Sequence, residues 1–228
     1  MRIYFITIPL SLALAGGGAL FYLRSKMAFG DQPIVGNLPK HPVSEAMRLN
    51  ALAESKKVAP EFLLADLTGR KRTRRDAQGG KLTLFYFVQN GCPCSIDVEP
   101  LFHALWKHHE GRVNFVAIID SEPGKAKVWA EQNATPYLML CSPDSAAMRA
   151  YHAPQSVYST LVAAEGTVIA QYPGYSQRIL SEMNVAMAKV SGTAAKPFDT
   201  AYAPKADSSG CAFKGAEQIT DAGDGPSE

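Results

Sequence analysis

The sequence predicts an α/β domain built around a mixed β-sheet, with helices on both faces of the sheet. Three observations support this prediction. Apolar runs rich in β-branched and aromatic residues alternate with segments in which apolar residues recur at helical spacing. Two short strands joined by a turn, followed by a helix, close the pattern. The chain of 228 residues, 46% hydrophobic and 19% charged, is long enough to bury the core of one domain and to carry further segments.

The first 29 residues are expected to direct the chain to a membrane. Residues 3–23 are almost wholly apolar and uncharged, and a helix needs about 20 such residues to cross a bilayer. A cleaved secretory signal is the alternative, with Ala13-Leu14-Ala15 as its small-residue cleavage site. We therefore expect a single-pass protein of the cell membrane with its domain on the extracytoplasmic side, or a secreted or periplasmic protein after cleavage.

Residues 30–57 mix Gly, Pro and polar residues, and we interpret them as a linker between the membrane and the domain. Ser44 can cap a short helical pattern within the linker, at residues 44–52. The domain proper is expected at residues 58–192. From residue 193 to residue 228 the composition changes to Ala, Pro, Ser, Gly and Asp, which predicts a flexible, disordered tail. This tail contains Cys211.

Within residues 58–192, an extended segment at 59–69 comes first. Strands are then expected at residues 82–88, 113–119, 137–140, 158–163 and 168–172, and helices at residues 97–109, 123–132, 143–151 and 177–190. The run at 82–88 is continuously apolar or aromatic apart from one threonine, as a strand buried on both faces requires. Strands that alternate with helices before a closing hairpin imply the mixed sheet.

The charged residues and cysteines exclude several classes of function. A formal net charge of +2 is too small to indicate a nucleic-acid or strongly acidic partner. The basic cluster at residues 70–75 is interpreted as a solvated loop or hairpin. Four cysteines are too few for a disulfide scaffold, and they lack the paired Cys-x-x-Cys units of a structural zinc site. We therefore expect no nucleic-acid partner, no cofactor and no structural metal.

The motif Gly91-Cys92-Pro93-Cys94 lies between a predicted strand and a predicted helix. Such a turn directs backbone N–H groups and the positive end of the helix towards the thiols, which favours the thiolate. Cys92 is expected to be the more exposed thiol and to act as the nucleophile, and Cys94 is expected to be the resolving thiol. A disulfide across one residue is tight, and strain makes a disulfide easier to reduce. Two buried, inert thiols are the alternative.

Cys211 offers a second route to resolution. About twenty tail residues precede it, and a flexible chain of that length spans about 25 Å. The radius of gyration of the domain is about 14 Å, so the tail can bring Cys211 to Cys92. An unpaired tail thiol is equally compatible with the sequence. Cys141 ends a predicted buried strand, and we interpret it as a packed structural thiol.

Several segments together resemble the thioredoxin-like redoxin family. They are Ala59-Pro60 with Asp66 and Gly69, the apolar run at residues 84–87, and Cys92-Pro93. Residues 137–144 are similar to the strand and turn that precede a short helix in this family, and residues 161–168 resemble its closing hairpin. The family includes peroxiredoxins of the alkyl hydroperoxide reductase/thiol-specific antioxidant type and membrane-tethered thioredoxins. The resemblance covers residues 58–190 and implies a thioredoxin-like three-layer fold.

The resemblance also implies a function. It indicates an exported, membrane-anchored thiol–disulfide oxidoreductase that acts on protein or small-molecule thiols and disulfides and depends on a membrane-side or periplasmic reductant. The site residues implied are Cys92 and Cys94, with Cys211 as the further candidate. Thioredoxins have their second cysteine where Ser95 stands, and peroxiredoxins have a threonine where Gln89 stands.

Three other functions remain open. One is a peroxiredoxin-like thiol peroxidase, in which Cys92 is oxidised to a sulfenic acid. The second is a Sco-like copper-binding assembly factor without turnover, because copper(I) favours thiolates and His152 precedes a strand that faces the thiols in this fold. The third is a redox-inert interaction domain. We interpret the other candidates for proton transfer or ligation as solvated, capping or turn residues rather than as functional groups; they are Asp97, Glu99, Asp120, His103, His108 and His109.

Overall fold

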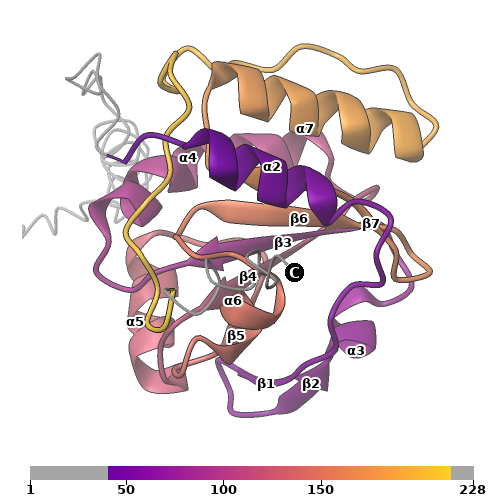
Figure 1. Ribbon diagram of the computed structural model, residues 1–228. Helices are drawn as coiled ribbons and strands as arrows, with labels where there is room; N and C mark the ends of the chain where they lie inside the picture. Colours follow the sequence, from indigo (N-terminus) through magenta and orange to yellow (C-terminus); the bar gives the residue numbers. More distant parts are fainter. Residues whose placement is uncertain (1–40, 217–228) are drawn as a thin grey trace, which may run out of the picture. The chain divides into compact units, whose positions relative to one another are not determined.

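A computed structural model describes residues 41–216 of the chain (Figure 1). The predicted membrane segment at residues 1–29, the start of the predicted linker and residues 217–228 lie outside this range. In the described part of the chain, no helix is long and apolar enough to cross a membrane.

A mixed sheet of seven strands forms the centre of the domain, in the order β2-β1-β5-β4-β3-β6-β7. The strands β3, β4 and β5 run parallel to one another, whereas β6 pairs antiparallel with β3, and β1 pairs antiparallel with β5. The bounds are β1 Leu63–Asp66, β2 Lys71–Thr73, β3 Thr83–Val88, β4 Asn114–Ile119, β5 Leu138–Cys141, β6 Tyr158–Val162 and β7 Val168–Pro173. The predicted mixed sheet is therefore confirmed.

Strand β3 lies in the interior of the sheet, and every one of its residues is buried. Its side chains alternate between the two faces, as in any strand. Leu84, Tyr86 and Val88 belong to the core cluster on one face, and Phe85 and Phe87 belong to the cluster on the other face. This double burial explains the continuous apolar run in the sequence.

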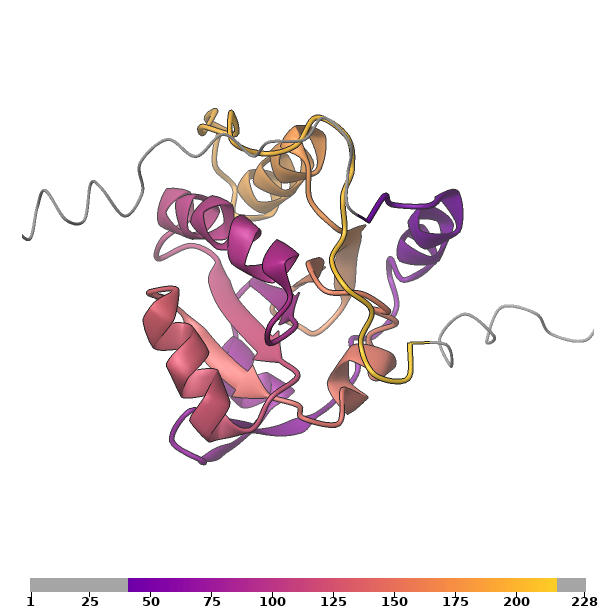
Figure 2. The ribbon, with the colours of Figure 1, turned by 90° about the vertical axis from the view of Figure 1, so that its left-hand side faces the viewer.

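Helices cover both faces of the sheet (Figures 1 and 2). Residues of α4, α5 and α7 contribute to one core cluster, and residues of α2, α3 and α6 contribute to the other. The bounds are α2 Glu45–Ala53, α3 Arg74–Gln78, α4 Pro93–His108, α5 Pro123–Gln132, α6 Ala146–Ala150 and α7 Gln177–Val190. The bounds predicted for α5 and α7 match the structure. Helix α4 begins four residues earlier than predicted, because Pro93 occupies its first position.

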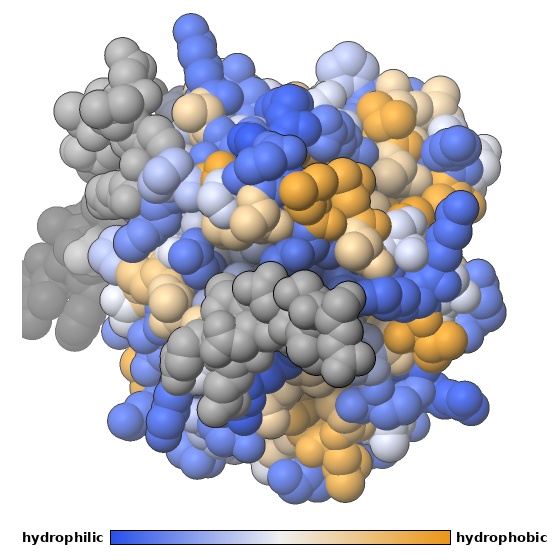
Figure 3. Space-filling view, in the orientation of Figure 1, coloured by the Kyte–Doolittle hydropathy of each residue, from blue (hydrophilic) through white to orange (hydrophobic). Residues whose placement is uncertain are grey.

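The predicted linker differs from the structure over its described part. Ser44 caps α2, as predicted, by accepting a hydrogen bond from the N–H of Met47. The chain after α2 then pairs with β7, since the N–H of Lys56 donates to the carbonyl of Val168 (2.8 Å). Residues 41–57 are thus part of the domain. The sequence did not indicate this because α2 buries little apolar surface and exposes Leu49 and Leu52. Figure 3 shows an apolar patch over the α2 region of this face.

The basic cluster at residues 70–75 is only partly solvated. Part of it forms β2, which pairs with β1 in a hairpin, and a hairpin was one of the two predicted alternatives. However, Arg74 at the start of α3 is buried, and its guanidinium donates to Gln78 and to Glu61. A buried arginine needs such partners, which a count of charges along the sequence cannot identify.

The predicted flexible tail is also corrected over residues 193–216. These residues form no helix and no regular strand, but Ser208, Ser209, Gly210 and Phe213 are buried against the domain. We refer to residues 206–213 as the covering segment. In Figures 1 and 2 it is the yellow stretch of irregular chain that passes the amino end of α4. A composition poor in large apolar residues predicted mobility, yet the segment is held mainly by backbone hydrogen bonds, which composition does not reveal.

Candidate active site

Cys92 occupies the turn that joins the end of β3 to the start of α4. It is the N-cap residue of α4, and Pro93 is the first residue of the helix. The turn is closed by the N–H of Cys92, which donates to the carbonyl of Gln89 (3.2 Å), and by the N–H of Gln89, which donates to Ser95 Oγ (3.2 Å). The predicted strand–turn–helix setting of the motif is confirmed, and the positive end of α4 lies at the sulfur of Cys92.

Hydrogen-bond donors surround the sulfur of Cys92. Ser156 Oγ donates to it over 3.3 Å, and the backbone N–H of Cys211 donates to it over the same distance. The thiol of Cys211 lies 3.0 Å from it, sulfur to sulfur, and the Cys94 thiol also hydrogen-bonds to it. Hydrogen bonds to a sulfur stabilise the thiolate more than the thiol.

These donors place the pKa of Cys92 well below the ordinary value of a thiol. The hydrogen bond from Cys94 lowers the pKa most, and the bonds from the Cys211 thiol, Ser156 and the Cys211 backbone lower it further, whereas burial opposes them. A thiol of this kind is largely thiolate at neutral pH and is therefore a nucleophile. The contrasting case is Cys141, whose pKa is raised to about 11 by burial and by the nearby charges of Glu122 and Asp66.

The expected difference in exposure between the two thiols of the motif is wrong. Cys92 is 3% exposed and Cys94 is 4% exposed. Cys94 is buried because it lies in the first turn of α4, and both sulfurs belong to the core cluster on that face. Cys92 is buried because the covering segment and Ser156 lie against it. A reaction with a large partner therefore requires the covering segment to move.

The covering segment pairs with the loop that leads into β6. The N–H of Ser156 donates to the carbonyl of Cys211, and the N–H of Gly210 donates to the carbonyl of Ser156, both over 2.9 Å. One step further along, the N–H of Phe213 donates to the carbonyl of Pro154 (2.9 Å). Gln155 and Ala212 form the antiparallel bridge of this pairing. The pairing fixes the position of Cys211 beside Cys92.

The other end of the covering segment is held by charge and by backbone pairing. Asp207 accepts hydrogen bonds from Ser176 Oγ (2.7 Å), from the guanidinium of Arg48 (3.0 Å) and from that of Arg178. The backbones of Tyr175 and Ser208 donate to each other, over 2.7 Å and 3.0 Å. The residues that precede α2 contribute as well, since the N–H of Ser209 donates to the carbonyl of His41 (2.8 Å).

The three carboxylates singled out in the sequence lie in different surroundings. Asp120 follows β4 and accepts the N–H of Asn90 (2.7 Å), in the turn that carries Cys92. Burial raises the pKa of Asp120 to about 6, the bond from Asn90 lowers it, and the charge of Cys92 raises it further. Glu99 is buried within α4, where it contacts His103 (3.0 Å) and Tyr137 (3.3 Å). Asp97 is exposed. Asp120 is thus the carboxylate best placed to exchange protons near Cys92.

The histidines singled out in the sequence do not gather at the thiols. His152 pairs with Glu54, which follows α2 (2.9 Å), and His109 at the end of α4 pairs with Asn184 (2.8 Å). Within residues 41–216, no group of three or more His, Cys, Asp or Glu side chains is arranged to hold a metal ion. One histidine outside the predicted set does approach the site, because His41 Nε2 lies 3.8 Å from Cys211 Sγ.

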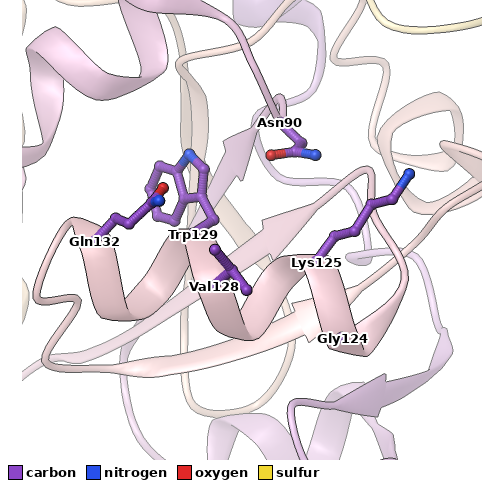
Figure 4. A pocket seen from close by; sticks show the side chains of 6 residues that line it. All are labelled: Asn90, Gly124, Lys125, Val128, Trp129 and Gln132. Atoms are coloured by element: carbon purple, nitrogen blue, oxygen red, sulfur yellow. The ribbon is translucent and has the colours of Figure 1, made fainter.

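A shallow cavity of about 270 Å³ lies on the α5 side of the same turn (Figure 4). Asn90 lines one edge of it, and Lys125, Val128, Trp129 and Gln132 of α5 line the other. The indole Nε1 of Trp129 is buried and has no hydrogen-bond partner in the described part of the chain. No thiol lines this cavity, so we do not include it in the candidate site.

The sequence missed Ser156, Gly210, His41 and Asp207. Ser156 donates a hydrogen bond to the sulfur of Cys92, and Gly210 passes close to Ser156 directly before Cys211. His41 and Asp207 contact the covering segment and help to position it. No local motif marks them, because each acts through a partner far away in the chain. The one available signal was a cysteine in a tail otherwise poor in reactive residues, directly preceded by a glycine.

Comparisons with known proteins agree with the fold. The profile of the AhpC/TSA family matches residues 56–174. A comparison with curated proteins found no match. Among solved structures, an uncharacterised conserved protein from Geobacillus kaustophilus is 20% identical with a TM-score of 0.57, over 70% of this chain and 91% of that one. A putative thiol:disulfide interchange protein DsbE from Chlorobium tepidum is 18% identical with a TM-score of 0.55, over 60% and 98%. A putative protein disulfide isomerase from Bacteroides thetaiotaomicron is 17% identical with a TM-score of 0.51, over 58% and 89%. These likenesses establish the thioredoxin-like fold.

Proposed function

The chain belongs to the AhpC/TSA family, and on this basis we propose that it is a thiol–disulfide oxidoreductase whose attacking group is the thiolate of Cys92. The observation that carries the proposal is the sulfur cluster at the amino end of α4. Cys92 accepts a hydrogen bond from the Cys94 thiol and lies 3.0 Å from the Cys211 sulfur. A thiolate in such a setting attacks disulfides, and a neighbouring thiol can then displace the product.

The reaction takes place in two exchanges. The Cys92 thiolate attacks one sulfur of a partner disulfide, a bond forms between Cys92 and that sulfur, and the other sulfur leaves as a thiolate. A second thiol of this chain, as thiolate, then attacks Cys92 and releases the first sulfur of the partner. The partner gains two electrons, and its two thiolates take up two protons, one released by the second thiol of this chain and one from solvent. A thiol reductant must afterwards reduce the new internal disulfide, and the whole sequence also runs in reverse.

The second thiol in this proposal is Cys211 rather than Cys94. The sequence favoured Cys94, but a disulfide between residues separated by one position is strained. The sulfur of Cys211 approaches Cys92 on a separate segment, whose backbone is paired with Ser156. His41 Nε2, 3.8 Å from that sulfur, is positioned to accept the Cys211 proton. Cys94 then serves mainly as the donor that stabilises the Cys92 thiolate.

The experiment that tests the proposal is insulin-disulfide reduction with dithiothreitol as electron donor. Wild-type protein should accelerate the reduction, and Cys92→Ser should be inactive, because the thiolate that the surrounding donors stabilise is then absent. Cys141→Ala is the matched control and should retain the wild-type rate, since Cys141 lies at the end of β5 with a raised pKa. Equal activity of wild type and Cys92→Ser would rule the proposal out.

We also propose that the domain works outside the cytoplasm, attached to the membrane or exported through residues 3–23. The support comes from the apolar composition of that segment and from the persistence of disulfides in oxidising compartments. Its redox partners would then be extracytoplasmic proteins and a membrane-side or periplasmic reductant. Fusion of alkaline phosphatase to the C-terminus tests this location, and an inactive fusion in intact cells would contradict it.

A thiol peroxidase is the second candidate, and the position of Cys211 is the observation that favours it. In this case Cys92 takes one oxygen from a hydroperoxide and becomes a sulfenic acid, while the rest of the peroxide leaves as an alcohol. Cys211 then forms the disulfide and water is released. Reduced protein that consumes one equivalent of peroxide within seconds, while leaving insulin intact, would favour this candidate over disulfide exchange.

A further inference from the structure

The covering segment approaches the rest of the domain closely at two glycines. Gly174 precedes α7, and a Cβ added to it would overlap the backbone carbonyl of Ser208. Gly210 lies in the covering segment, and a Cβ there would overlap Ser156 Oγ and lie 3.3 Å from Cys92 Sγ. The φ angle of Gly210 lies outside the left-handed region, so its backbone conformation suits any residue. Glycine is required at position 210 by space alone.

Ser156 is the side chain that imposes this requirement, and it has little freedom to move. It is fully buried, and its hydroxyl donates to Cys92 Sγ (3.3 Å). Its backbone N–H and carbonyl are both paired with the covering segment. The next residue, Val157, is anchored to β3 because its N–H donates to the carbonyl of Phe87 (2.9 Å). Ser156 therefore contacts Cys92 and, at the same time, the residue before the approaching cysteine.

The pairing also fixes the register of the approaching chain. When one residue both donates and accepts a backbone hydrogen bond with an antiparallel segment, it fixes the alignment of that segment. The alignment determines which side chains of the segment point towards the site. Ser156 makes both bonds, one to the carbonyl of Cys211 and one from the N–H of Gly210. A second chain that used these two groups would present its cysteine to Cys92 only in this register, as in peptide recognition by strand addition.

From these contacts we propose that Ser156 determines specificity, so that the site reacts faster with a cysteine in an extended segment when a glycine immediately precedes it. Gly210-Cys211 is the resident ligand of the site. The reaction partner is a protein that presents its own Gly-Cys segment in a disulfide and displaces the covering segment. The Cys92 thiolate attacks that cysteine, the partner's disulfide bond breaks, and its other sulfur leaves as a thiolate and takes a proton from solvent. This inference rests on the proposed role of Cys92.

The first test uses the resident ligand in the full chain. The measured quantity is the equilibrium between the Cys92–Cys211 disulfide and glutathione, with the pairing identified by mass spectrometry. Gly210→Ala should weaken disulfide formation at least about tenfold, since it forces atoms into a filled space. Ser156→Ala in the same chain should restore it to within about threefold, because the clashing hydroxyl is gone. Gly124→Ala, in α5 with open space around it, is the matched control and should match wild type.

The second test uses two peptides, Ser-Gly-Cys-Ala and Ser-Ala-Cys-Ala, each as a symmetrical disulfide. They react with the full-length Cys211→Ser variant, and the mixed disulfide on Cys92 is followed with time. The glycine peptide should react at least about tenfold faster, and Ser156→Ala should reduce this preference to about threefold or less.

The outcomes separate this inference from the proposed function. If both peptides react at the same rate, or if Gly210→Ala behaves like wild type, the specificity of the site is refuted while the role of Cys92 stands. If neither peptide nor insulin reacts with Cys92, the proposed function itself fails, and this inference fails with it. Loss of disulfide formation in Gly210→Ala that Ser156→Ala does not restore indicates general disruption of the segment, and also overturns the inference.

Discussion

The sulfur of Cys92 lies 3.0 Å from the sulfur of Cys211, although 119 positions separate the two residues in the sequence. The first sulfur is fixed by the turn after β3, and the second by the pairing of the covering segment with Ser156. The domain therefore contains two alternative partners for one nucleophile, Cys94 within the motif and Cys211 on the covering segment.

Removal of the resolving thiol should trap the intermediate. Cys211→Ser is expected to accumulate a mixed disulfide between Cys92 and a partner, because the nearest sulfur outside the motif is absent. Cys94→Ser should release the partner at close to the wild-type rate, since closure across one residue is strained. Non-reducing electrophoresis of insulin reactions measures the trapped species. Accumulation in Cys94→Ser and not in Cys211→Ser would assign resolution to Cys94.

The reactivity of Cys92 should depend on pH in a way that reflects its hydrogen bonds. Because its pKa is lowered, chiefly by Cys94, its rate of alkylation by iodoacetamide should stay constant as the pH falls through neutrality. Cys94→Ala should move the fall in rate to a higher pH, and Ser156→Ala should move it less. Mass spectrometry of the Cys92 peptide gives the rates. A wild-type profile centred on the ordinary thiol range, near pH 9, would show that the thiolate is not stabilised.

Asp120 should govern a second pH-dependent step. Its pKa of about 6 predicts an inflection near that pH in kcat/KM for disulfide exchange, and Asp120→Asn should remove the inflection.

The Asp120 carboxyl also affects folding stability. Its pKa is raised in the folded state, so its ionisation costs stability as the pH rises from about 4 to about 6. At pH 7 the variant should therefore be as stable as wild type or more stable, by about 1 kcal/mol, a value reduced for partial exposure. Urea unfolding and pH–rate profiles measure both effects. An unchanged profile would exclude Asp120 from the reaction.

Asp207 should control access to Cys92. Burial works against the Asp207 carboxylate, but its bonds from Arg178, Ser176 and Arg48 keep its pKa below the ordinary value. The contact is thus complete at neutral pH and weakens as the pH falls below about 4. Asp207→Asn removes the anion that two guanidinium groups share, so that Arg48 keeps only Glu45 and Arg178 keeps only Glu182 among the described residues, at a cost of about 1–3 kcal/mol.

The readout for Asp207→Asn is hydrogen exchange in residues 206–213 together with Cys92 alkylation at pH 7. Both should accelerate by roughly tenfold or more, since about 1.4 kcal/mol corresponds to a factor of ten. Asp199→Asn is the matched control, because that carboxylate lies before the covering segment and accepts the N–H of the nearby Ala201. Acceleration of alkylation without a change in exchange would mean that opening of the segment does not limit access.

Asp66 should contribute to stability, not to catalysis. Hydrogen bonds from Thr68, Arg72 and the backbone lower its pKa from 3.8 to about 2. This stabilisation is complete above pH 4 and is lost as the pH falls towards 2. Asp66→Asn should lower the free energy of unfolding by about 2 kcal/mol at pH 7 and by less at pH 2.5. Glu131→Gln, on the surface of α5, is the control. An effect of Asp66→Asn that is independent of pH would contradict the assignment.

The sequence predicted the central part of the fold well because each element there carries a local signal. The apolar run of β3, the helical spacing in α7 and the proline at the start of α5 depend only on neighbouring residues. The turn at Cys92 was found for the same reason. The basic cluster was interpreted too simply, because the buried Arg74 depends on Glu61, which lies outside it.

The candidate site was only half predictable. Cys92 and Cys94 stand in one motif, whereas Ser156 and Gly210 act on Cys92 from distant parts of the chain. Their residue types are ordinary in loops, and only the pairing of two irregular segments gives them a role. The exposure of Cys92 was predicted wrongly for the same reason, since a tail classified by composition was not expected to cover it.

The position of the covering segment has a consequence for biosynthesis. A ribosome makes the chain from its amino end, and domains can fold during synthesis. The sheet and all the described helices are complete at Val190, before residues 206–213 exist. Until those residues emerge, Cys92 lacks both the segment that covers it and the neighbouring thiol of Cys211. The newly made protein therefore passes through an interval in which its most reactive sulfur is more open to oxidants and foreign thiols, and the arrival of residues 206–213 ends that interval.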